Sequence, residues 1–356
     1  MKGLILAGGH GTRLRPLTHT GPKQLIPIAN KPNILYCLED IRNAGITEIG
    51  VILGNNMPEK VIGLLEDGSK FGVKIEYIKQ GEPKGIAHAI GCAEKFIGDD
   101  GFVVYLGDNI LKGGITNMVN DFMKGEYTAS VVLCKVKEPQ RFGVVELDEK
   151  GKIKRLVEKP KEFVSDLALA GIYFFRKEIF GVIKELKPSW RNELEITEAI
   201  DKIVKLGKNV NYYIVTGWWK DTGKPEDILE ANNLILDELI PYNYGKIMEN
   251  VELIGRVGIG KGTVINEGCS IRGPALIGEN CKIGPRTYIG PYTSIGDNSE
   301  IVGCEIQGSI VIGETKILCK RRIIDSLIGK SVEITESKVV PEGYRLIIGE
   351  NSKIMI

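Results

Sequence analysis

Glycines and basic side chains near the start of the chain have the composition of a phosphate-binding turn. The apolar stretch from Gly3 to Ala7 predicts a strand, and glycines follow it at positions 8, 9 and 11. Glycines leave backbone N–H groups uncovered, and a tight turn of such groups forms an anion-binding concavity. Arg13, Arg15 and Lys23 add positive charge beside this turn. The stretch therefore predicts a cradle for a polyphosphate.

Two familiar phosphate-binding motifs fit this turn less well. The P-loop pattern GxxxxGK[ST] does not occur in the run. The dinucleotide fingerprint GxGxxG would need a third glycine where Leu14 stands. A plain tight turn remains the alternative for the glycines alone, but it gives no reason for the many polar and cyclic residues that follow them.

Two acidic residues have the chemistry to hold a metal ion near phosphates. Asp108 comes directly after the strand predicted from Phe102 to Leu106, and Asp221 lies in the segment GWWKDTG. Mg²⁺ commonly takes one or two carboxylates together with substrate oxygens and water. The two residues therefore predict a Mg²⁺ site, and a turn-capping role for Asp108 is the alternative.

Alternating strands and helices would bring these residues to one edge of a sheet. Apolar residues at helical spacing predict a helix over residues 33–44, ended by Gly45, and a second helix over residues 58–65. Strands are predicted over residues 49–53 and 73–78. Such alternation is typical of a parallel sheet covered on both faces, whose ligands bind beyond the carboxyl ends of the strands.

The C-terminal part has a different pattern, which begins beyond a helix predicted over residues 225–240. Isoleucine recurs every six residues from Ile259 to Ile301, eight times in succession. This hexapeptide repeat predicts a left-handed parallel β-helix with the isoleucines pointing inward. Ile312, Ile328 and Ile334 suggest further, imperfect coils. We therefore expect two domains, residues 1–241 and residues 242–356.

Composition narrows the class of protein. The chain has 356 residues, of which 43% are hydrophobic and 26% are charged, as in an ordinary globular protein. A net charge of +1 gives no overall field that would favour nucleic acid or a membrane surface, and no apolar run is long enough to span a membrane. Seven scattered cysteines without a CxxC pair predict reduced thiols in a cytoplasmic protein, not a disulfide framework or a zinc site.

The motifs, and the order in which they occur along the chain, resemble those of the nucleotidyltransferases that make nucleotide-sugars. The signature of that family, LAGGxGTRLxPLT followed by PKQLIPI and KP, matches residues 6–32 at every defined position. The resemblance implies a Rossmann-like domain with a mixed, mostly parallel sheet ahead of the β-helix, and Mg²⁺ as the cofactor. Two further runs, KPSWRxELEIT and TGWWKDTGKPED, resemble the branch of the family that transfers thymidylyl groups to glucose-1-phosphate.

The resemblance also implies where the nucleotide binds. An amide side chain can read the imide edge of a base, and Gln80 and Gly85 would contact thymine or uracil. His88 departs from a commoner glutamine, and a polar turn before a helix is the alternative for this segment. The expected Mg²⁺ ligands are Asp108 and Asp221. The expected nucleotide-binding residues are Leu6, Gly8, Gly9, Gly11, Thr12, Gln80, Gly85 and Asp108.

A third group of residues is implied for the sugar phosphate. The N–H of Gly143 would face the sugar, Glu158 would meet a sugar hydroxyl and Lys159 would meet the phosphate. A solvated charge pair is the alternative for Glu158 and Lys159. Arg191 is a candidate phosphate contact in the run SWRNELEITE, where Asn192 and Glu198 depart from the family pattern. The expected set is Asn109, Gly143, Glu158, Lys159 and Arg191.

The activity implied is attack of a sugar-1-phosphate on the α-phosphate of dTTP, which gives dTDP-glucose and pyrophosphate. Arg13, Lys23 and Lys159 would be the catalytic residues. UTP is the nearest alternative, because thymine and uracil differ by one methyl group. An acetyl-CoA acyltransferase in the β-helix is disfavoured, since no histidine follows His88. A non-catalytic regulatory subunit is a further alternative, and a homo-oligomer is expected.

Overall fold

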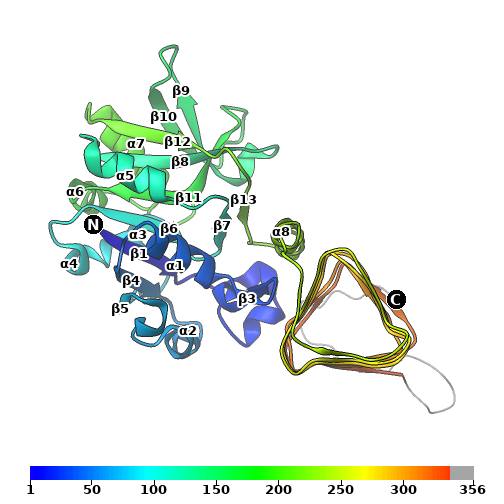
Figure 1. Cartoon of the computed structure of the whole chain (residues 1–356). Coiled ribbons are helices and arrows are strands. Elements are labelled where there is room, and N and C mark those ends of the chain that lie inside the picture. The colour runs from blue at the N-terminus through cyan, green and yellow to red at the C-terminus, as the bar shows by residue number, and fades with distance from the viewer. Residues whose placement is uncertain (337–356) are drawn as a thin grey trace. The chain divides into compact units, whose positions relative to one another are not determined.

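The chain forms two compact units in the computed structural model, which describes residues 1–336 (Figure 1). The first unit comprises Met1–Gly11, Thr20–Leu25 and Asn33–Asp221. The second comprises Thr12–His19, Ile26–Pro32 and the chain from Thr222 onward. Two short pieces of the N-terminal signature are thus grouped with the C-terminal part. The domain boundary expected between residues 241 and 242 stays a prediction.

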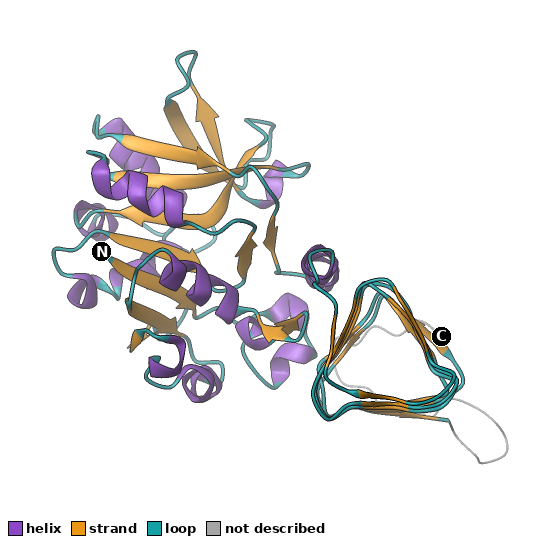
Figure 2. Ribbon diagram, viewed as in Figure 1, coloured by secondary structure: helices purple, strands orange, loops and turns teal. Residues whose placement is uncertain are grey.

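A mixed sheet of nine strands forms the centre of the first unit (Figure 2). Its strands follow the order β10-β9-β11-β6-β1-β4-β5, with β8 paired to β11 and β12 paired to β8. Their bounds are β1 Lys2–Ala7, β4 Glu48–Leu53, β5 Lys74–Lys79, β6 Phe102–Leu106, β8 Ala129–Lys135, β9 Gly143–Leu147, β10 Ile153–Glu158, β11 Leu167–Phe175 and β12 Val210–Ile214.

The direction of the strands brings several strand ends to one edge of the sheet. Strands β5, β4, β1 and β6 are parallel to one another, so their carboxyl ends lie together. Strand β11 runs antiparallel to β6 through residues 172–175 and continues past the end of β6, where Ala168 pairs with Val144 of β9. The space beyond the end of β6 is therefore bordered by β11 and β9.

Helices cover both faces of this sheet, and neighbouring residues of β1 show the division. Leu4 and Leu6 pack in a core with residues of α3, α4, α6 and α7, whereas Ile5 and Ala7 pack with residues of α1, α2 and α5. The helices of this unit are α1 Ile34–Asn43, α2 Pro58–Leu65, α3 Ile86–Gly91, α4 Glu94–Ile97, α5 Thr116–Lys124, α6 Glu178–Lys184 and α7 Ile196–Lys205. Short 3-10 turns are η3 Lys23–Leu25, η4 Ser69–Phe71 and η5 Pro139–Arg141.

The first two predicted helices are found close to their predicted bounds, and Gly45 follows α1 with a φ of 83°. The helix predicted over residues 225–240 is shorter in the structure, where α8 of the second unit spans Pro225–Leu236. Ile240 beyond it is 81% exposed. Pro241 disfavours helical geometry at the residue before it, which explains why no helix continues to that point. Within residues 1–336, no helix combines the length and the apolar character needed to cross a membrane.

A parallel β-helix forms most of the second unit, with three sheets that enclose a triangular section (Figure 1). The first sheet contains β14 Tyr242–Asn243, β17 Val257–Ile259, β20 Ala275–Ile277, β23 Thr293–Ile295, β26 Ile310–Val311 and β29 Leu327–Ile328. The second contains β15 Lys246–Ile247, β18 Val264–Ile265, β21 Lys282–Ile283, β24 Glu300–Val302, β27 Lys316–Leu318 and β30 Glu333–Thr335. The third contains β16 Glu252–Ile254, β19 Ser270–Arg272, β22 Tyr288–Ile289, β25 Glu305–Gln307 and β28 Arg322–Ile324. The remaining short elements of this unit are η1 Thr12–Leu14, η2 Leu17–His19, β2 Pro27–Ile28 and β3 Lys31–Pro32.

The hexapeptide repeat builds the core of the β-helix. Ile259 stacks on Ile277, and Ile277 stacks on Ile295 of the next coil. All eight isoleucines of the repeat are fully buried. The chain turns at corners where residues adopt positive φ at spacings of six or twelve residues, and asparagine or glycine fits several of them. Such corners are found at Gly262, Gly268, Asn280, Arg286, Tyr292 and Asn298. The predicted fold class, an α/β domain followed by a left-handed parallel β-helix, is confirmed.

The coils become shorter after Ile301. Ile295 stacks on Val311, and Val311 stacks on Ile328, so Val311 takes the inward position that the sequence suggested for Ile312. Ile312 is only partly buried. Ile328 and Ile334 occupy coil positions as expected. The neighbouring residue moves inward because a side chain on a strand changes face at every step.

Candidate active site

The glycine-rich turn after β1 lies against two of the predicted site residues. A Cβ atom on Gly8 would overlap Oε1 of Gln80, and a Cβ atom on Gly9 would lie 3.6 Å from Cε of Lys23. Gly11 has a φ of 63°, a conformation that favours glycine. Leu6, also predicted as a nucleotide contact, is largely buried in β1. The fold therefore gathers the turn, the amide and the lysine in one place.

Lys23 forms an ion pair with Asp108. Asp108 follows β6, its side chain is 9% exposed, and Asn109 donates a hydrogen bond from Nδ2 to its Oδ1 at 3.2 Å. Asn109 in turn accepts a hydrogen bond from Nε1 of Trp219 at 2.8 Å. A largely buried carboxylate with these partners has a defined orientation.

The pairing of two short strands brings Asp221 to the segment that carries Asp108. Strand β13, Trp219–Asp221, runs antiparallel to β7, Asn109–Leu111, and its register sets Asp221 opposite Asn109. The two carboxylates come from positions 113 residues apart in the sequence. Their oxygens are the hard ligands that Mg²⁺ prefers, and two carboxylates leave room for substrate oxygens and water. The donor set fits Mg²⁺, although residues 1–336 contain no group of three or more histidine, cysteine or acidic side chains arranged around one point.

Gln80 lies at the end of β5 and is held at both its backbone and its side chain. Its N–H donates to the carbonyl of Leu53 at 2.9 Å, and its Nε2 lies 3.2 Å from Nδ1 of His88. Gly85 has a φ of 98°, and a Cβ atom there would lie 2.8 Å from the backbone nitrogen of Leu194. Only glycine therefore fits at this helix start. Burial, and next the charge of Lys84, lower the pKa of His88 from its ordinary value of 6.5.

The predicted sugar-phosphate residues meet where β9 and β10 pair. Gly143 lies opposite Glu158, and a Cβ atom on Gly143 would lie 3.0 Å from Oε2 of Glu158. Lys159 donates its N–H to the carbonyl of Phe142 at 3.0 Å and has a φ of 41°. A left-handed lysine is strained, and such strain is often found at functional positions.

Glu158 is surrounded by both positive and negative groups. It accepts a hydrogen bond from Oγ1 of Thr197 at 3.2 Å and lies 3.3 Å from Nη1 of Arg191. The same guanidinium contacts Glu193 at 2.9 Å and Glu195 at 3.4 Å. Burial, and next the carboxylate of Glu195, raise the pKa of Glu158. Arg191 is thus held by carboxylates beside the residue that is predicted to bind a sugar hydroxyl.

Trp219 contacts both Asn109, the neighbour of Asp108, and Phe142, the neighbour of Gly143. Its ring packs edge-on against Phe142, the neighbour of Gly143, with 5.4 Å between the ring centroids, while its Nε1 binds Asn109. Along this edge of the sheet, Gln80 after β5 is followed by the glycine turn after β1, by Asp108 after β6 and by the β9–β10 pair. The residues predicted to contact the nucleobase, the phosphates and the sugar phosphate thus follow one another along the edge.

Comparison with known proteins identifies the family. The sequence profile of the nucleotidyl transferase family matches residues 2–238, and the profile of the GMPPB C-terminal domain matches residues 271–355. The chain belongs to the nucleotidyl transferase family. It is therefore a nucleotidyltransferase that acts on a nucleoside triphosphate and a sugar phosphate.

Relatives of this nucleotidyltransferase share its whole length. The low-salt glycan biosynthesis nucleotidyltransferase Agl11 of Haloferax volcanii is 49% identical, and the match covers 100% of both chains. The glucose-1-phosphate thymidylyltransferase of Streptomyces antibioticus is 46% identical over 100% of this chain and 99% of its own. A Bacillus anthracis crystal structure with sucrose, assigned as a glucose-1-phosphate thymidylyltransferase, is 40% identical. It covers 68% of this chain and 97% of its own with a TM-score of 0.64.

Thr12 and Arg13 of the nucleotidyltransferase signature belong to the second unit. They lie in η1, Thr12–Leu14, where both side chains are exposed. Their part in nucleotide binding stays a prediction, as do the roles of the other predicted site residues.

Three residues that the sequence motifs did not single out contact predicted site residues. Trp219 holds Asn109, Thr197 holds Glu158, and the buried Glu195 contacts Arg191. All three lie inside the runs TGWWKD and ELEIT, but a sequence motif does not show which members support others. The departure of Asn192 from glycine is explained by its φ of 59°, which asparagine tolerates better than other residues that have a side chain. Glu198 is exposed on α7, where a longer acid is accommodated.

Proposed function

We propose that this nucleotidyltransferase transfers the thymidylyl group of dTTP to glucose-1-phosphate, which gives dTDP-glucose and pyrophosphate. The observation that carries the proposal is the row of groups along one sheet edge, from the amide of Gln80 through the Lys23–Asp108 pair to Glu158. The Streptomyces antibioticus relative, which matches along the whole chain, bears the name of this activity.

The reaction needs alignment and charge neutralisation more than covalent help. A phosphate oxygen of glucose-1-phosphate attacks the α-phosphorus of dTTP in line. A new P–O bond forms as the bond between the α-phosphorus and the bridging oxygen breaks, and pyrophosphate leaves with the electron pair. Two anions must approach each other, so cationic side chains at both ends of the reacting line lower the barrier.

Three basic residues would supply that charge. Lys23, beside the glycine turn, would contact the α- and β-phosphates in place of Asp108. Arg13 would hold the departing pyrophosphate, and Lys159 would hold the phosphate of the attacking sugar. Phosphate oxygens suit both guanidinium and ammonium donors.

Asp108 and Asp221 would hold Mg²⁺, whose positive charge offsets the charge that builds on the α-phosphate. The pairing of β13 with β7 supports this assignment, because it sets the backbone of Asp221 opposite Asn109, the residue after Asp108. Lys23 partly neutralises Asp108 in the free protein, so the carboxylate is paired before the nucleotide arrives.

The choice between dTTP and UTP depends on one methyl group. The amide of Gln80 would pair with the imide edge that both bases share, so this contact does not separate them. One methyl group in a pocket changes affinity by only about 1–3 kcal/mol. We therefore propose dTTP as the main substrate and expect measurable turnover of UTP.

Pyrophosphate release tests the function directly. We expect fast release with dTTP, glucose-1-phosphate and Mg²⁺ when dTTP, UTP, GTP, CTP and ATP are compared with several sugar-1-phosphates. Asp108→Asn should reduce kcat by about 10²–10³-fold, as the loss of an electrostatic contact to the reacting group does elsewhere. Asp99→Asn is the matched control, since the side chain of Asp99 is 89% exposed and forms an ion pair with Lys177.

The outcome also separates the alternatives. Equal rates with UTP would keep the reaction and make the thymidylyl assignment too narrow. No release with any pair, from protein shown to be folded, would overturn the catalytic proposal in favour of a regulatory subunit.

Two broader proposals accompany the activity. All seven cysteines are free thiols, which supports a reducing, cytoplasmic location. We also propose a homo-oligomer, which light scattering coupled to size-exclusion chromatography would measure. A mass equal to one chain of 39.2 kDa across the working concentration range would contradict it.

A further inference from the structure

The β2–β3 hairpin of the N-terminal signature has a strained tip. Pro27 pairs with Pro32 and Ile28 with Lys31, which leaves Ala29 and Asn30 as the two turn residues. Both have positive φ, 46° for Ala29 and 61° for Asn30, as in a type I′ turn. Asparagine tolerates this conformation, but alanine does so poorly. Contacts from outside the hairpin must therefore hold the tip in place.

Asn232 of α8 provides the first of these contacts. Its side chain is fully buried and makes three hydrogen bonds. Oδ1 accepts the N–H of Ala29 at 3.0 Å and the hydroxyl of Ser294 at 3.0 Å, and Nδ2 donates to the carbonyl of Tyr292 at 3.1 Å. One amide thus joins the strained alanine to a corner and a strand of the β-helix.

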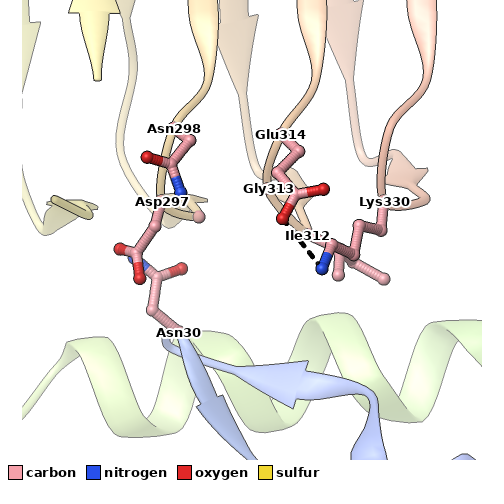
Figure 3. A pocket seen from close by; sticks show the side chains of 8 residues that line it. Asn30, Asp297, Asn298, Ile312, Gly313, Glu314 and Lys330 are labelled. Carbon is pink, nitrogen blue, oxygen red and sulfur yellow. Dashed lines mark ion pairs between the residues drawn. The ribbon is translucent and has the colours of Figure 1, made fainter. Parts of the chain in front are cut away.

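Asn30 provides the second contact. Its Nδ2 donates to the carbonyl of Ile295 at 2.7 Å, at the end of the strand that carries Ser294. Figure 3 shows Asn30 at the hairpin tip, pointing toward Asp297 and Asn298 of the next corner. A polar pocket of about 190 Å³ adjoins it, lined by side chains that include Asp297, Asn298, Glu314 and Lys330. The tip of the hairpin therefore lies among polar groups of the β-helix.

The hairpin is continuous with the proposed phosphate-binding lysine. Lys23 lies in η3, four residues before Pro27, and the amide of Leu25 donates to the carbonyl of Pro22 at 3.0 Å. Three residues, Gln24 to Ile26, therefore separate Lys23 from the first residue of the hairpin. Proline at both Pro22 and Pro27 stiffens this short connection.

We propose that Asn232 is a positioning residue for nucleotide binding. By tying the hairpin tip to the β-helix, it fixes the backbone that carries Lys23, so the β-helix contributes to the affinity of the catalytic part for the nucleotide. This inference rests on the proposed function, because it assigns Lys23 to the phosphates. It gives the β-helix a role in nucleotide binding without any residue of its own that contacts the nucleotide.

The test compares three variants of the whole chain. Asn232→Ala removes all three bonds. Asn30→Gly removes only the bond to Ile295 and keeps a residue that accepts positive φ. Asn266→Ala is the matched control, because Asn266 makes one side-chain bond, to the carbonyl of Ile283 at 2.9 Å, elsewhere in the β-helix. Melting temperatures confirm that each variant is folded.

Two readouts separate positioning from plain stability. We expect Asn232→Ala to raise the Kd of dTTP with Mg²⁺ and the KM for dTTP by about tenfold, with the KM for glucose-1-phosphate changed less than about twofold. Asn30→Gly should raise the same Kd and the KM for dTTP by about threefold. A purely structural role would lower the active fraction, and hence the apparent kcat, while leaving both KM values unchanged.

Hydrogen exchange of the free protein gives a readout that needs no activity. We expect the backbone amides of residues 20–26 to exchange at least about tenfold faster in Asn232→Ala, and at the wild-type rate in Asn266→Ala. If residues 20–26 exchange at the wild-type rate in both Asn232→Ala and Asn30→Gly, the proposal is overturned even if the enzyme turns over dTTP. Faster exchange in a protein that releases no pyrophosphate would instead keep the clamp and reject the proposed function.

Discussion

Nδ1 of His88 lies within hydrogen-bonding distance of the amide that is proposed to read the base. Nε2 of Gln80 can only donate, so Nδ1 of His88 must carry no proton when the bond forms. The lowered pKa of His88 keeps the ring neutral at pH 7. A group whose pKa falls on folding adds stability above its unfolded pKa, here 6.5, and that stability is lost as the pH drops through the lowered pKa.

Nucleotide affinity should therefore weaken in acid. We expect the Kd for dTTP to be constant from about pH 8 to pH 7 and to rise by about fivefold once His88 is protonated, because one hydrogen bond worth about 1 kcal/mol is lost. The phosphates of dTTP also titrate, so His88→Gln is the reference at each pH. Parallel pH profiles for the two proteins would show that His88 does not act on Gln80.

At the scale of single elements, the inward isoleucines of successive β-helix coils stack on one another. Ile283 lies between Ile265 and Ile301 on the coils before and after it and is fully buried. Lys282, the residue before it, points outward and is exposed. Close-packed interiors respond to the loss of a few methylene groups, whereas exposed positions do not.

Truncation of an inward isoleucine should lower the stability more than truncation of its exposed neighbour. We expect Ile283→Ala to lower the free energy of unfolding by about 2–5 kcal/mol through lost burial and the cavity that remains. Lys282→Ala should stay within about 0.5 kcal/mol of the parent. Urea unfolding followed by circular dichroism measures both, and similar losses in the two variants would show that the coil core relaxes around the cavity.

At the scale of the whole molecule, the chain passes between its two units several times. Thr12–His19 and Ile26–Pro32 group with the C-terminal part, although the residues between and around them build the sheet unit. The hairpin tip forms hydrogen bonds with Asn232 and Ile295, which lie far along the chain. A cut in the linear sequence therefore removes contacts of the N-terminal signature.

A chain that ends at residue 241 tests both this dependence and the expected domain boundary. We expect it to fold but to lose at least about 2 kcal/mol of unfolding free energy, because Asn232 and Asn30 would lose buried partners. Its Kd for dTTP should rise at least as much as in Asn232→Ala. Full stability and affinity in the shortened chain would show that residues 1–241 are a self-sufficient domain.

The amino-acid sequence alone determined the fold class of this nucleotidyltransferase. Apolar spacing located α1, α2 and β6 within one or two residues, and the six-residue period of isoleucine specified the β-helix until its coils shortened at Val311. These features are local: a helix or a coil repeats its own pattern, so the pattern is visible in the residues themselves. Motif order was also enough to name the candidate site residues.

Tertiary structure decided how those residues meet. The pairing of β13 with β7 sets Asp221 opposite Asn109, the neighbour of Asp108, and the side chain of Trp219 contacts both Asn109 and Phe142. Asn232 carried no signal in the sequence, because a buried asparagine in a helix looks like any polar residue until its partners are known. Contacts between distant segments depend on strand register and on burial, and neither is written in the local pattern of side chains.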